Sequence, residues 1–462
     1  MLQLKTKKEL SQEAFKLARS FEFVRYRSIT YMPVDYETRD NHVTPSPERT
    51  IWVPLNRDGI RRRAAEQFDT MFATESELSS FDFMVAQSAH GHYQDVHDLL
   101  VRTDEGLRVL DGTGAVRETD GSFVPNTLLP ALNTDPDEKA RVLGIITEWV
   151  DGEEEAHSLL RHLATALAPG WSAVKYVLLL GGGRNGKSTL IKMLNGVFGS
   201  DNISNVTRQQ ISELSPVVTD LNGKLLNLIY DGPAVYLKDS GAEKSLIAGE
   251  PYSIRRLYES NPTVVQTNAL FVEGLQHEPK SKDKSTALQK RLMRFYFPNV
   301  YPLDLKFEER MLREDSLGAF LSLLIDHYVQ RDDVAEALAP TDRAMELQLE
   351  HMFANSLGLQ FIKHLEEHDP LGAQGLVGQE TTELALAFAK WRLKENDLGQ
   401  WAEPDVLTQF APLINTERKS KRVSGAVRKI RVVTGLKTEA LAFIESLKGD
   451  MQDDDILALV ED

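Results

Sequence analysis

The sequence contains no cysteine among its 462 residues. This absence excludes disulfide bonds, thiolate nucleophiles and cysteine-ligated zinc sites. The chain also has no apolar run close to the ~20 residues that a membrane-spanning helix needs, and its lysine-containing first segment has no apolar signal core. We therefore expect a cytoplasmic protein with no membrane partner.

The sequence has fewer basic than acidic residues. Lys and Arg number 53 against 69 Asp and Glu, which gives a formal net charge of −16. A surface with this balance repels polyanions as a whole. Any contact with nucleic acid must therefore come from local basic clusters, and their positions are more informative than the total charge.

The length predicts roughly three domains at about 150 residues each. Strand-like segments and Asp-Gly turns predict a mixed α+β domain over residues 1–126, and apolar residues at helical spacing predict a helical segment over 127–168. Strands and helices then alternate over 169–312, which predicts an α/β core. Residues 313–378 are predicted to form a helical region and linker, and 379–462 a small basic domain with an acidic tail.

The most specific motif is a glycine-rich phosphate-binding pattern, G-x-x-x-x-G-K-[ST]. An apolar strand is predicted over 175–180 directly before it, and an amphipathic helix directly after it. This strand–loop–helix context favours nucleotide binding. The predicted nucleotide-binding residues are Gly181, Gly182, Gly183, Arg184, Asn185, Gly186, Lys187, Ser188 and Thr189.

The residue types fit ATP and Mg²⁺. Glycines allow backbone N–H groups to turn toward phosphates at a helix N-terminus, Lys187 reaches the β- and γ-phosphates, and Ser188 offers a hydroxyl ligand to Mg²⁺. A second apolar strand over 225–230 ends in Asp231, which is predicted to organise Mg²⁺ and the attacking water. Kinases, switches, motors and helicases share such a loop, so the loop does not identify the reaction.

The order of motifs resembles the superfamily-three helicases, in the branch of phage and poxvirus primase-helicases. The resemblance covers roughly residues 100–345. It is carried by GGGRNGKSTL around the loop, by KSLIAGEPYSIRRLY at 244–258, by TVVQTN at 263–268 and by QKRLMRFYFP at 289–298.

This resemblance implies a P-loop, AAA+-like ATPase that works in phage or mobile-element replication, in the host cytoplasm if phage-encoded. It implies a hexameric homo-oligomer that translocates 3′ to 5′ on single-stranded and forked DNA, with a separate primase or polymerase as a further partner. By position in the motifs, Asn268 would end a strand and sense the γ-phosphate, and Arg291 would reach a neighbouring subunit's nucleotide. Arg255 and Arg256 would contact DNA from a hairpin over 252–267.

Two features depart from the family pattern. Asp231 is followed by Gly232 where a second acid is usual, and Asn268 runs into Ala269 rather than an acid. The single acid favours an alternative function, a DNA-replication initiator or loader that uses ATP as an assembly switch without processive unwinding. A kinase or small-molecule NTPase is a third alternative, in which the hairpin and the basic C-terminal segment would have no role.

A last basic cluster lies at 417–433, with seven Lys and Arg against one acid. After helical segments at 380–394 and 404–414, it resembles the third helix and the wing of a winged-helix domain. We expect this cluster to bind DNA, with a solvated basic helix as the alternative. The predicted contact residues are Arg418, Lys419, Lys421, Arg422, Arg428 and Lys429.

Overall fold

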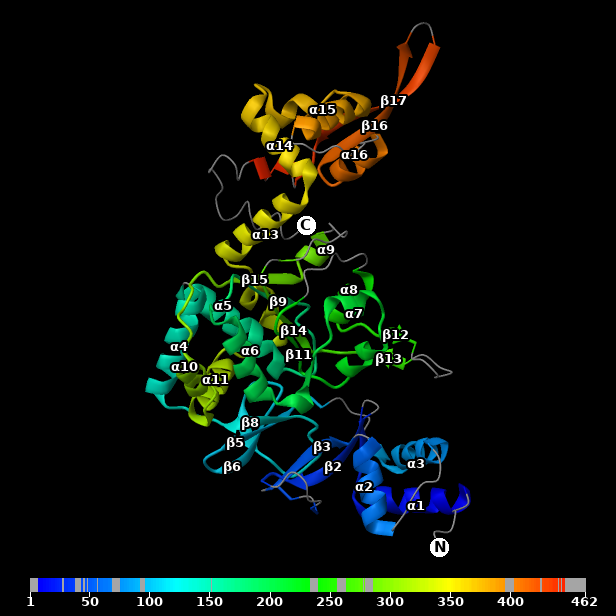
Figure 1. The fold of residues 1–462 in the computed structure, drawn as a ribbon, viewed down its shortest axis with the longest axis vertical. Coiled ribbons are helices and arrows are strands. Elements are labelled where there is room, and N and C mark those ends of the chain that lie inside the picture. The colour runs from blue at the N-terminus through cyan, green and yellow to red at the C-terminus, as the bar shows by residue number, and fades with distance from the viewer. Residues whose placement is uncertain are drawn as a thin grey trace. The chain divides into compact units, whose positions relative to one another are not determined.

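The chain forms a mixed α/β structure with several sheets and many helices (Figure 1). It divides into two compact units: the first holds residues 1–283 and 291–341, and the second holds 284–290 and 342–462. This division falls inside the region 313–378. The computed structural model describes residues 7–26, 29–37, 43–44, 46–47, 49–55, 57–68, 75–91, 96–150, 152–232, 240–255, 263–276, 278, 286–394, 403–423, 426–438, 440–441 and 443–444.

The N-terminal part of the first unit is α+β, as predicted. It has two four-stranded sheets, ordered β3-β2-β1-β4 and β7-β6-β5-β8. Three helices pack with the first sheet around buried apolar residues such as Phe23, Val34 and Phe81. The elements are α1 (Lys7–Ser20), β1 (Val24–Tyr26), β2 (Ile29–Asp35), β3 (Thr50–Leu55), α2 (Arg57–Phe68), α3 (Glu75–Ser88), β4 (His90–Gly91), β5 (Leu99–Thr103), β6 (Gly106–Leu110), β7 (Val116–Glu118) and β8 (Thr127–Ala131).

The segment predicted to be helical over 127–168 contains two helices, α4 (Pro136–Val150) and α5 (Glu153–Ala164), whereas its first residues, 127–131, form strand β8. The apolar stripes of the two helices are buried, including Ile146 and Trp149 on α4 and Leu159 on α5. A later helix, α11 (Glu314–Asp326), packs against both. Two short helices complete this region, α10 (Leu305–Met311) and α12 (Val334–Ala337).

The centre of the first unit is a five-stranded sheet in the order β10-β11-β14-β9-β15, in which every neighbouring pair is parallel. Its inner strands are buried on both faces, which explains their nearly continuous apolar sequences. Because all strands run the same way, the loops after them meet at one carboxyl edge, and those before them meet at the opposite amino edge. The strands are β9 (Tyr176–Leu180), β10 (Ile203–Ser204), β11 (Leu226–Ile229), β14 (Leu270–Leu275) and β15 (Leu292–Tyr296).

Helices and one hairpin surround this sheet (Figure 1). Helix α6 (Lys187–Phe198) follows β9 and packs on β11 and β14. The shorter α7 (Arg208–Ser212) and α8 (Gly241–Ile247) precede a separate antiparallel pair, β12 (Tyr252–Ile254) with β13 (Thr263–Val265). The predicted antiparallel pairing of these two segments is confirmed, although only their paired ends are described.

The second unit combines helices with one long two-stranded ribbon. Its core is an aromatic cluster of Phe361, Phe388, Trp391 and Phe410. Its elements are α9 (Thr286–Gln289), α13 (Asp342–Asn355), α14 (Leu357–His368), α15 (Thr381–Lys394), α16 (Glu403–Phe410), β16 (Ile414–Val423) and β17 (Ala426–Leu436). No helix in the described part of the chain is long and apolar enough to cross a membrane.

The expectation that the basic cluster at 417–433 supplies a third helix is wrong. The cluster forms β16 and β17, which pair in an antiparallel register from Ile414↔Leu436 to Val423↔Ala426. The physical reason is the β-branched content of the second half, Val427, Ile430, Val432 and Val433, which favours strands over helix. The two helical segments predicted before the cluster correspond to α15 and α16.

Candidate functional site

The glycine loop, residues 181–186, joins β9 to α6 at the carboxyl edge of the central sheet. Its backbone has positive φ at Gly181 (139°), Arg184 (60°) and Gly186 (97°). A Cβ on Gly186 would lie 2.6 Å from the indole of Trp149, so only glycine fits there, whereas Gly182 and Gly183 face open space. The loop therefore exposes bare backbone directly before a helix N-terminus, where anions are favoured.

Lys187 is the first residue of α6 and is nearly buried. Its ammonium donates to the carbonyls of Gly181 (2.6 Å) and Gly182 (2.7 Å) and to Asn185 Oδ1 (3.0 Å). Burial lowers the pKa of Lys187 to about 8, and the Asp231 carboxylate acts in the opposite direction. The ammonium is thus held inside the loop and interacts electrostatically with Asp231.

Asp231 lies two residues beyond β11, as the sequence predicts for an acid that ends an apolar strand, and it is exposed. Gly232 extends the backbone hydrogen bonding between β11 and β14, since its N–H donates to the carbonyl of Gly274 (2.9 Å). Ser188 and Thr189 occupy the first turn of α6, and Ser188 is exposed. Lys187, Ser188 and Asp231 therefore belong to the same carboxyl edge. Whether they bind ATP and Mg²⁺ stays a prediction.

Asn268 was expected to end the strand predicted at 263–268, and it lies three residues beyond that strand, β13 (Thr263–Val265). Its contact with the γ-phosphate stays a prediction. The strand before Asn268, β13, belongs to the separate β12–β13 pair, and the sheet strand β14 begins only at Leu270. Asn268 therefore precedes β14, at the amino edge, and β14 alone spans roughly 17 Å at about 3.3 Å per residue. The residue that follows β14 at the carboxyl edge is Gln276, directly after Leu275, whose carbonyl accepts from Gly181 N–H (3.2 Å).

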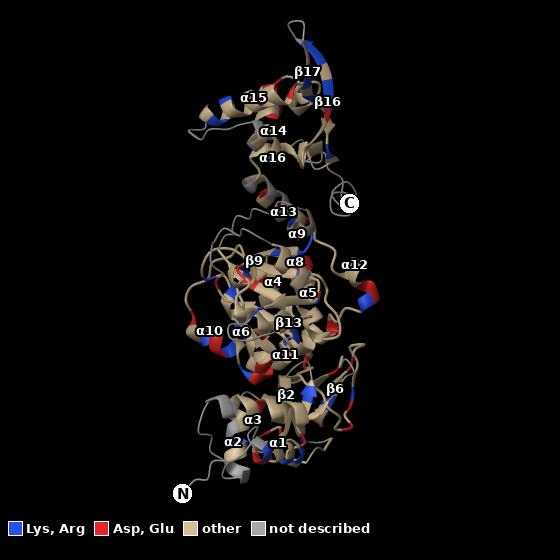
Figure 2. Cartoon of the chain, turned by 90° about the vertical axis from the view of Figure 1, so that its right-hand side faces the viewer, with Lys and Arg blue, Asp and Glu red and all other residues tan. Residues whose placement is uncertain are grey.

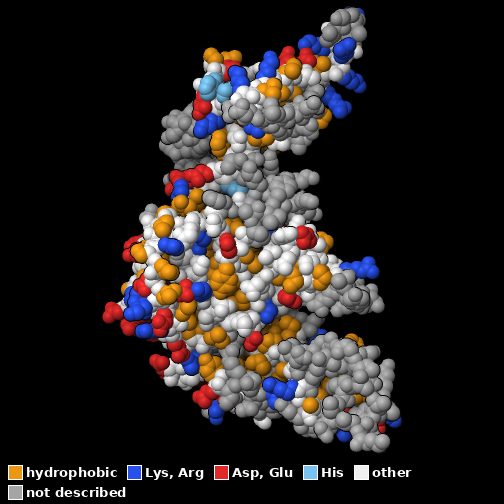
Figure 3. Space-filling view, viewed as in Figure 1, with side chains coloured by type: hydrophobic (Ala, Val, Ile, Leu, Met, Phe, Trp, Pro, Cys, Tyr) orange, Lys and Arg blue, Asp and Glu red, His pale blue; other side chains and the backbone are white. Residues whose placement is uncertain are grey.

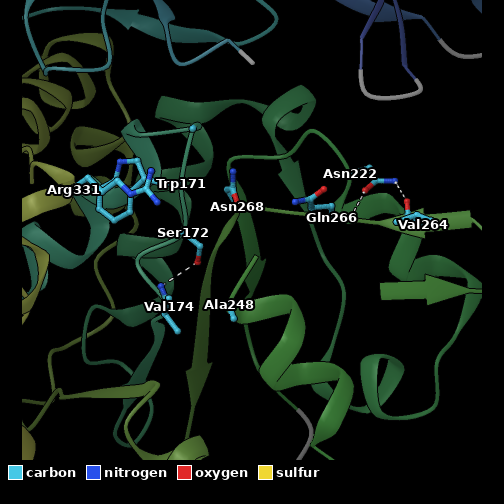
Figure 4. A pocket seen from close by; sticks show the side chains of 10 residues that line it. Trp171, Ser172, Val174, Asn222, Ala248, Val264, Gln266, Asn268 and Arg331 are labelled. Carbon is cyan, nitrogen blue, oxygen red and sulfur yellow. Dashed lines mark hydrogen bonds between the residues drawn. The ribbon is translucent and has the colours of Figure 1, made fainter. Parts of the chain in front are cut away.

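Asn268 lines a groove of about 610 Å³ at this amino edge. Figure 4 shows Asn268 in the middle, with Trp171 and Arg331 on one side and Gln266 and Asn222 on the other. The amides hold backbone segments together: Asn268 Nδ2 donates to the carbonyl of Pro169 (3.1 Å), and Asn222 Oδ1 accepts from Gln266 N–H (3.1 Å). These contacts give Asn268 a structural role.

Arg291 also lies at the amino edge. It comes directly before β15, and its carbonyl accepts from the N–H of Tyr176 at the start of β9 (2.7 Å). The structure therefore separates Arg291 from the glycine loop of its own chain by the length of β9. A role in a neighbouring subunit's site stays a prediction.

The predicted DNA-contacting pair is only partly described. Arg255 directly follows β12 and is exposed. Arg256 lies outside the described residues, so its predicted contact is not addressed by the structure.

Sequence reasoning missed a cavity beside the glycine loop. It has a volume of about 550 Å³, which falls in the range of small-molecule sites. Its walls include Trp149 from α4, Phe307 from α10 and Tyr301, whose N–H donates to the carbonyl of Arg184 (2.8 Å). The cavity thus joins an aromatic surface to the exposed end of the loop. The sequence offers no signal for it, because Trp149 lies more than 150 positions from Tyr301 and Phe307.

Sequence reasoning also missed Glu273, a buried acid within β14. Its Oε2 accepts from the Tyr176 hydroxyl (3.1 Å), and burial raises its pKa to about 7, against the opposing effect of Arg208. Arg208 itself forms a buried ion pair with Glu243 (2.6 Å). A Cβ on Gly232 would lie 1.9 Å from Glu273 Oε1. The space next to Asp231, where a second acid is usual, is therefore filled by a carboxyl group from the neighbouring strand.

Comparisons with known proteins add a fold relation. No known protein family and no curated protein matches the sequence. Among solved structures, the fold resembles an A-form apo structure of the NrS-1 C-terminal region, with a TM-score of 0.50 and 11% identity over 91% of this chain and 98% of that chain. Two further structures of that region, residues 305–718, have TM-scores of 0.46 at 11% identity and cover 92% of this chain and 100% of theirs. At this identity the likeness concerns the fold alone.

Proposed function

We propose that this protein is an ATP-dependent DNA helicase that acts in the replication of a phage or mobile element. The observation that carries the proposal is the carboxyl edge of the central sheet, where a bare glycine loop, Lys187 and Asp231 come together. In parallel α/β sheets, ligands bind at this edge. The family resemblance of the ordered motifs supports DNA unwinding as the use of the hydrolysed ATP.

The residues at this edge fit a nucleoside triphosphate. The backbone of Gly182 and Gly183 is unobstructed, and the α6 N-terminus offers further N–H donors. Lys187 would exchange its contacts with loop carbonyls for contacts with phosphate oxygens, which suits its nearly buried position. The aromatic cavity with Trp149, Tyr301 and Phe307 would take the base, because it opens beside the same loop.

Mg²⁺ fits between a hydroxyl and a carboxylate, the oxygen ligands that this ion prefers. Ser188 and Asp231 are exposed residues at this edge and would hold it. When bound, the ion would neutralise phosphate charge. We place Gln276 rather than Asn268 in the role of contacting the γ-phosphate, since Gln276 follows β14 at the carboxyl edge.

Translocation is assigned to the β12–β13 pair, with Arg255 and Arg256 as the cations that contact single-stranded DNA. The superfamily-three resemblance supports a hexameric ring in which Arg291 contacts the nucleotide of the next subunit. Its position at the amino edge, away from its own glycine loop, is compatible with that role.

The test is ATP hydrolysis and strand displacement on a forked DNA substrate. Lys187→Ala should lower both by about 10²–10³-fold, as the loss of one preorganised charge at a reacting phosphate does. Lys192→Ala is the matched control on the same helix, because Lys192 pairs with Glu308 (2.6 Å) instead of the loop. If Lys187→Ala leaves hydrolysis at the wild-type rate, the nucleotide site is wrongly assigned.

The second candidate function is an initiator or loader that uses ATP as an assembly switch. It is favoured by the single exposed acid at the end of β11, since Gly232 leaves no second one. This candidate predicts ATP-dependent assembly on DNA without strand displacement. Measuring both on the same preparation separates the two functions.

A further inference from the structure

The ribbon formed by β16 and β17 brings seven Lys and Arg residues of the second unit together on two paired strands, and Figures 2 and 3 show basic side chains along it. Residues that lie directly opposite each other in an antiparallel pair project from the same face, and successive residues alternate. The register pairs Arg418 with Arg431 and Ser420 with Lys429, and Arg422 alternates onto the same side. The other side pairs Lys419 with Ile430 and Lys421 with Arg428. We call these the arginine face (Arg418, Arg422, Lys429, Arg431) and the lysine face (Lys419, Lys421, Arg428).

The two faces differ in how their charges are compensated. On the lysine face, Lys421 forms an ion pair with Glu380, and Lys419 lies 3.7 Å from Glu417. On the arginine face, none of the four cations forms an ion pair with an acid in the described part of the chain. Like charges placed directly opposite each other destabilise a two-stranded ribbon. Arg418 and Arg431 are such a pair, so an external anion would relieve a repulsion that the protein itself leaves uncompensated.

The form of the ribbon favours duplex DNA over single-stranded DNA. The sequence 414–436 contains no Phe, Trp or Tyr, whereas surfaces that bind single strands combine cations with aromatic side chains that stack on bases. A two-stranded ribbon fits the major groove of B-DNA, which is about 12 Å wide. The helix before it, α16, has the sequence EPDVLTQF, with two acids and no cation, so it is unsuited to contact phosphates.

We propose that the arginine face binds the phosphate backbone of duplex DNA, largely without reading base sequence. The contact is made by the ribbon, and α16 stays out of the groove. The proposal deepens the proposed helicase function and rests on it for its biological role, by naming a site for the double-stranded part of a fork. The binding itself requires no ATP, so it can be measured independently of hydrolysis.

The experiment measures binding of the full chain to a short mixed-sequence duplex, without nucleotide, across a range of salt concentrations. The test variant is Arg418→Gln/Lys429→Gln/Arg431→Gln, and the matched control is Lys419→Gln/Lys421→Gln/Arg428→Gln. Both remove three positive charges from the same ribbon. They differ only in the face from which the charges are removed.

Each phosphate contact contributes about −0.9 to the slope of log K against log salt. The arginine-face variant should therefore lose about 2 to 3 units of slope. Between about 50 and 200 mM salt, wild-type affinity should fall about 40-fold more than the affinity of this variant. The lysine-face variant should keep a slope within about 1 unit of the wild type. Equal losses in the two variants, or an unchanged slope in the arginine-face variant, would overturn the proposal.

Further measurements keep the outcome unambiguous. Arg418→Lys/Arg431→Lys retains the charge and should retain the slope; its loss would show that the arginine-face effect is structural and would overturn the proposal. In the arginine-face variant, the affinity for single-stranded DNA should change less than the affinity for duplex. A larger change for single-stranded DNA would also overturn the proposal. Lys187→Ala should bind duplex normally. If the wild type binds duplex through this face yet hydrolyses no ATP, the proposed function fails and the ribbon contact stands.

Discussion

The two edges of the central sheet differ in what their polar residues contact. At the carboxyl edge the glycine loop leaves backbone exposed, Lys187 and Asp231 interact, and an aromatic cavity of about 550 Å³ opens beside them. At the amino edge the amides of Asn222, Gln266 and Asn268 already bond backbone groups of neighbouring segments.

The difference teaches that strand direction decides the role of a polar residue next to an apolar strand. A residue after a parallel strand reaches the edge where helix N-termini and loops meet, whereas one before it stabilises the opposite edge. Asn268 and Gln276 lie on either side of the same strand, β14, and Gln276 lies at the carboxyl edge, where we propose that the triphosphate binds.

Between the two edges, the largest difference in hydrolysis is expected from the acid at the carboxyl edge. Asp231→Asn should lower ATP hydrolysis by about 10²-fold, because the amide keeps the shape but removes the negative charge that would organise Mg²⁺. Steady-state hydrolysis at saturating Mg²⁺ measures this. The matched change at the amino edge is Asn268→Ala, which should leave the rate within about twofold once the fraction of folded protein is accounted for. A larger loss from Asn268→Ala than from Asp231→Asn would invert the comparison.

The buried acid of β14 gives the next largest effect, on stability. Glu273 titrates near pH 4.5 when unfolded and at about 7 when folded, so between these values unfolding releases a proton. The free energy of unfolding should therefore fall by about 3 kcal/mol as pH rises across this window. Glu273→Gln keeps a neutral group of the same shape and should flatten this dependence.

Denaturant unfolding of the wild type and of Glu273→Gln at several pH values between about 5 and 8 measures this pH dependence of the free energy of unfolding. Glu308→Gln, a change on the surface helix α10, is the control that should keep the wild-type pH dependence. Parallel curves for the wild type and Glu273→Gln would show that the buried carboxyl does not stay protonated in the folded protein.

Much of the carboxyl edge could be predicted from the sequence because its residues are contiguous. The strand, loop and first turn of α6 occupy one run from Tyr176 to Thr189, so local pattern and backbone chemistry suffice. The helical pair α4–α5 was predictable for the same reason, since its apolar stripe repeats within each helix. Asp231 could be predicted as a candidate because it stands at the end of a single apolar run.

The rest depended on long-range pairing. The apolar run before Asn268 pairs with β12, as the predicted hairpin requires, but the sequence analysis did not identify the next run as the strand that enters the central sheet. The true sheet strand, LFVEGL, is interrupted by Glu273, which hides its buried character. In the ribbon, cations on both faces of β16 hide the alternation that marks a strand, so the cluster resembled a helix. The aromatic cavity brings together Trp149 and Tyr301, which are far apart in the sequence, so no local spacing of residues could predict it.

A smaller effect tests the reassignment along β14. Gln276→Ala should lower ATP hydrolysis by about tenfold, which corresponds to the loss of one hydrogen bond of about 1 to 1.5 kcal/mol. Gln276 is exposed, so the substitution should leave the thermal unfolding temperature unchanged. Hydrolysis and unfolding are measured on the same sample. If the activity is unchanged while Asp231→Asn is strongly impaired, another residue contacts the γ-phosphate.

The smallest effect concerns the wall of the aromatic cavity. Leu303 lines this cavity and is 75% exposed, so Leu303→Ala should not affect folding but should remove apolar surface that a bound base would cover. At about 0.8 kcal/mol per buried methylene, partial contact predicts about a fivefold weaker affinity for ATP. Equilibrium binding of a fluorescent adenine nucleotide measures it, with Leu371→Ala in the second unit, 71% exposed, as the control. Tripolyphosphate, which has no base, should bind both variants equally. An equal loss for tripolyphosphate would mean that Leu303 acts on the glycine loop and that the base binds elsewhere.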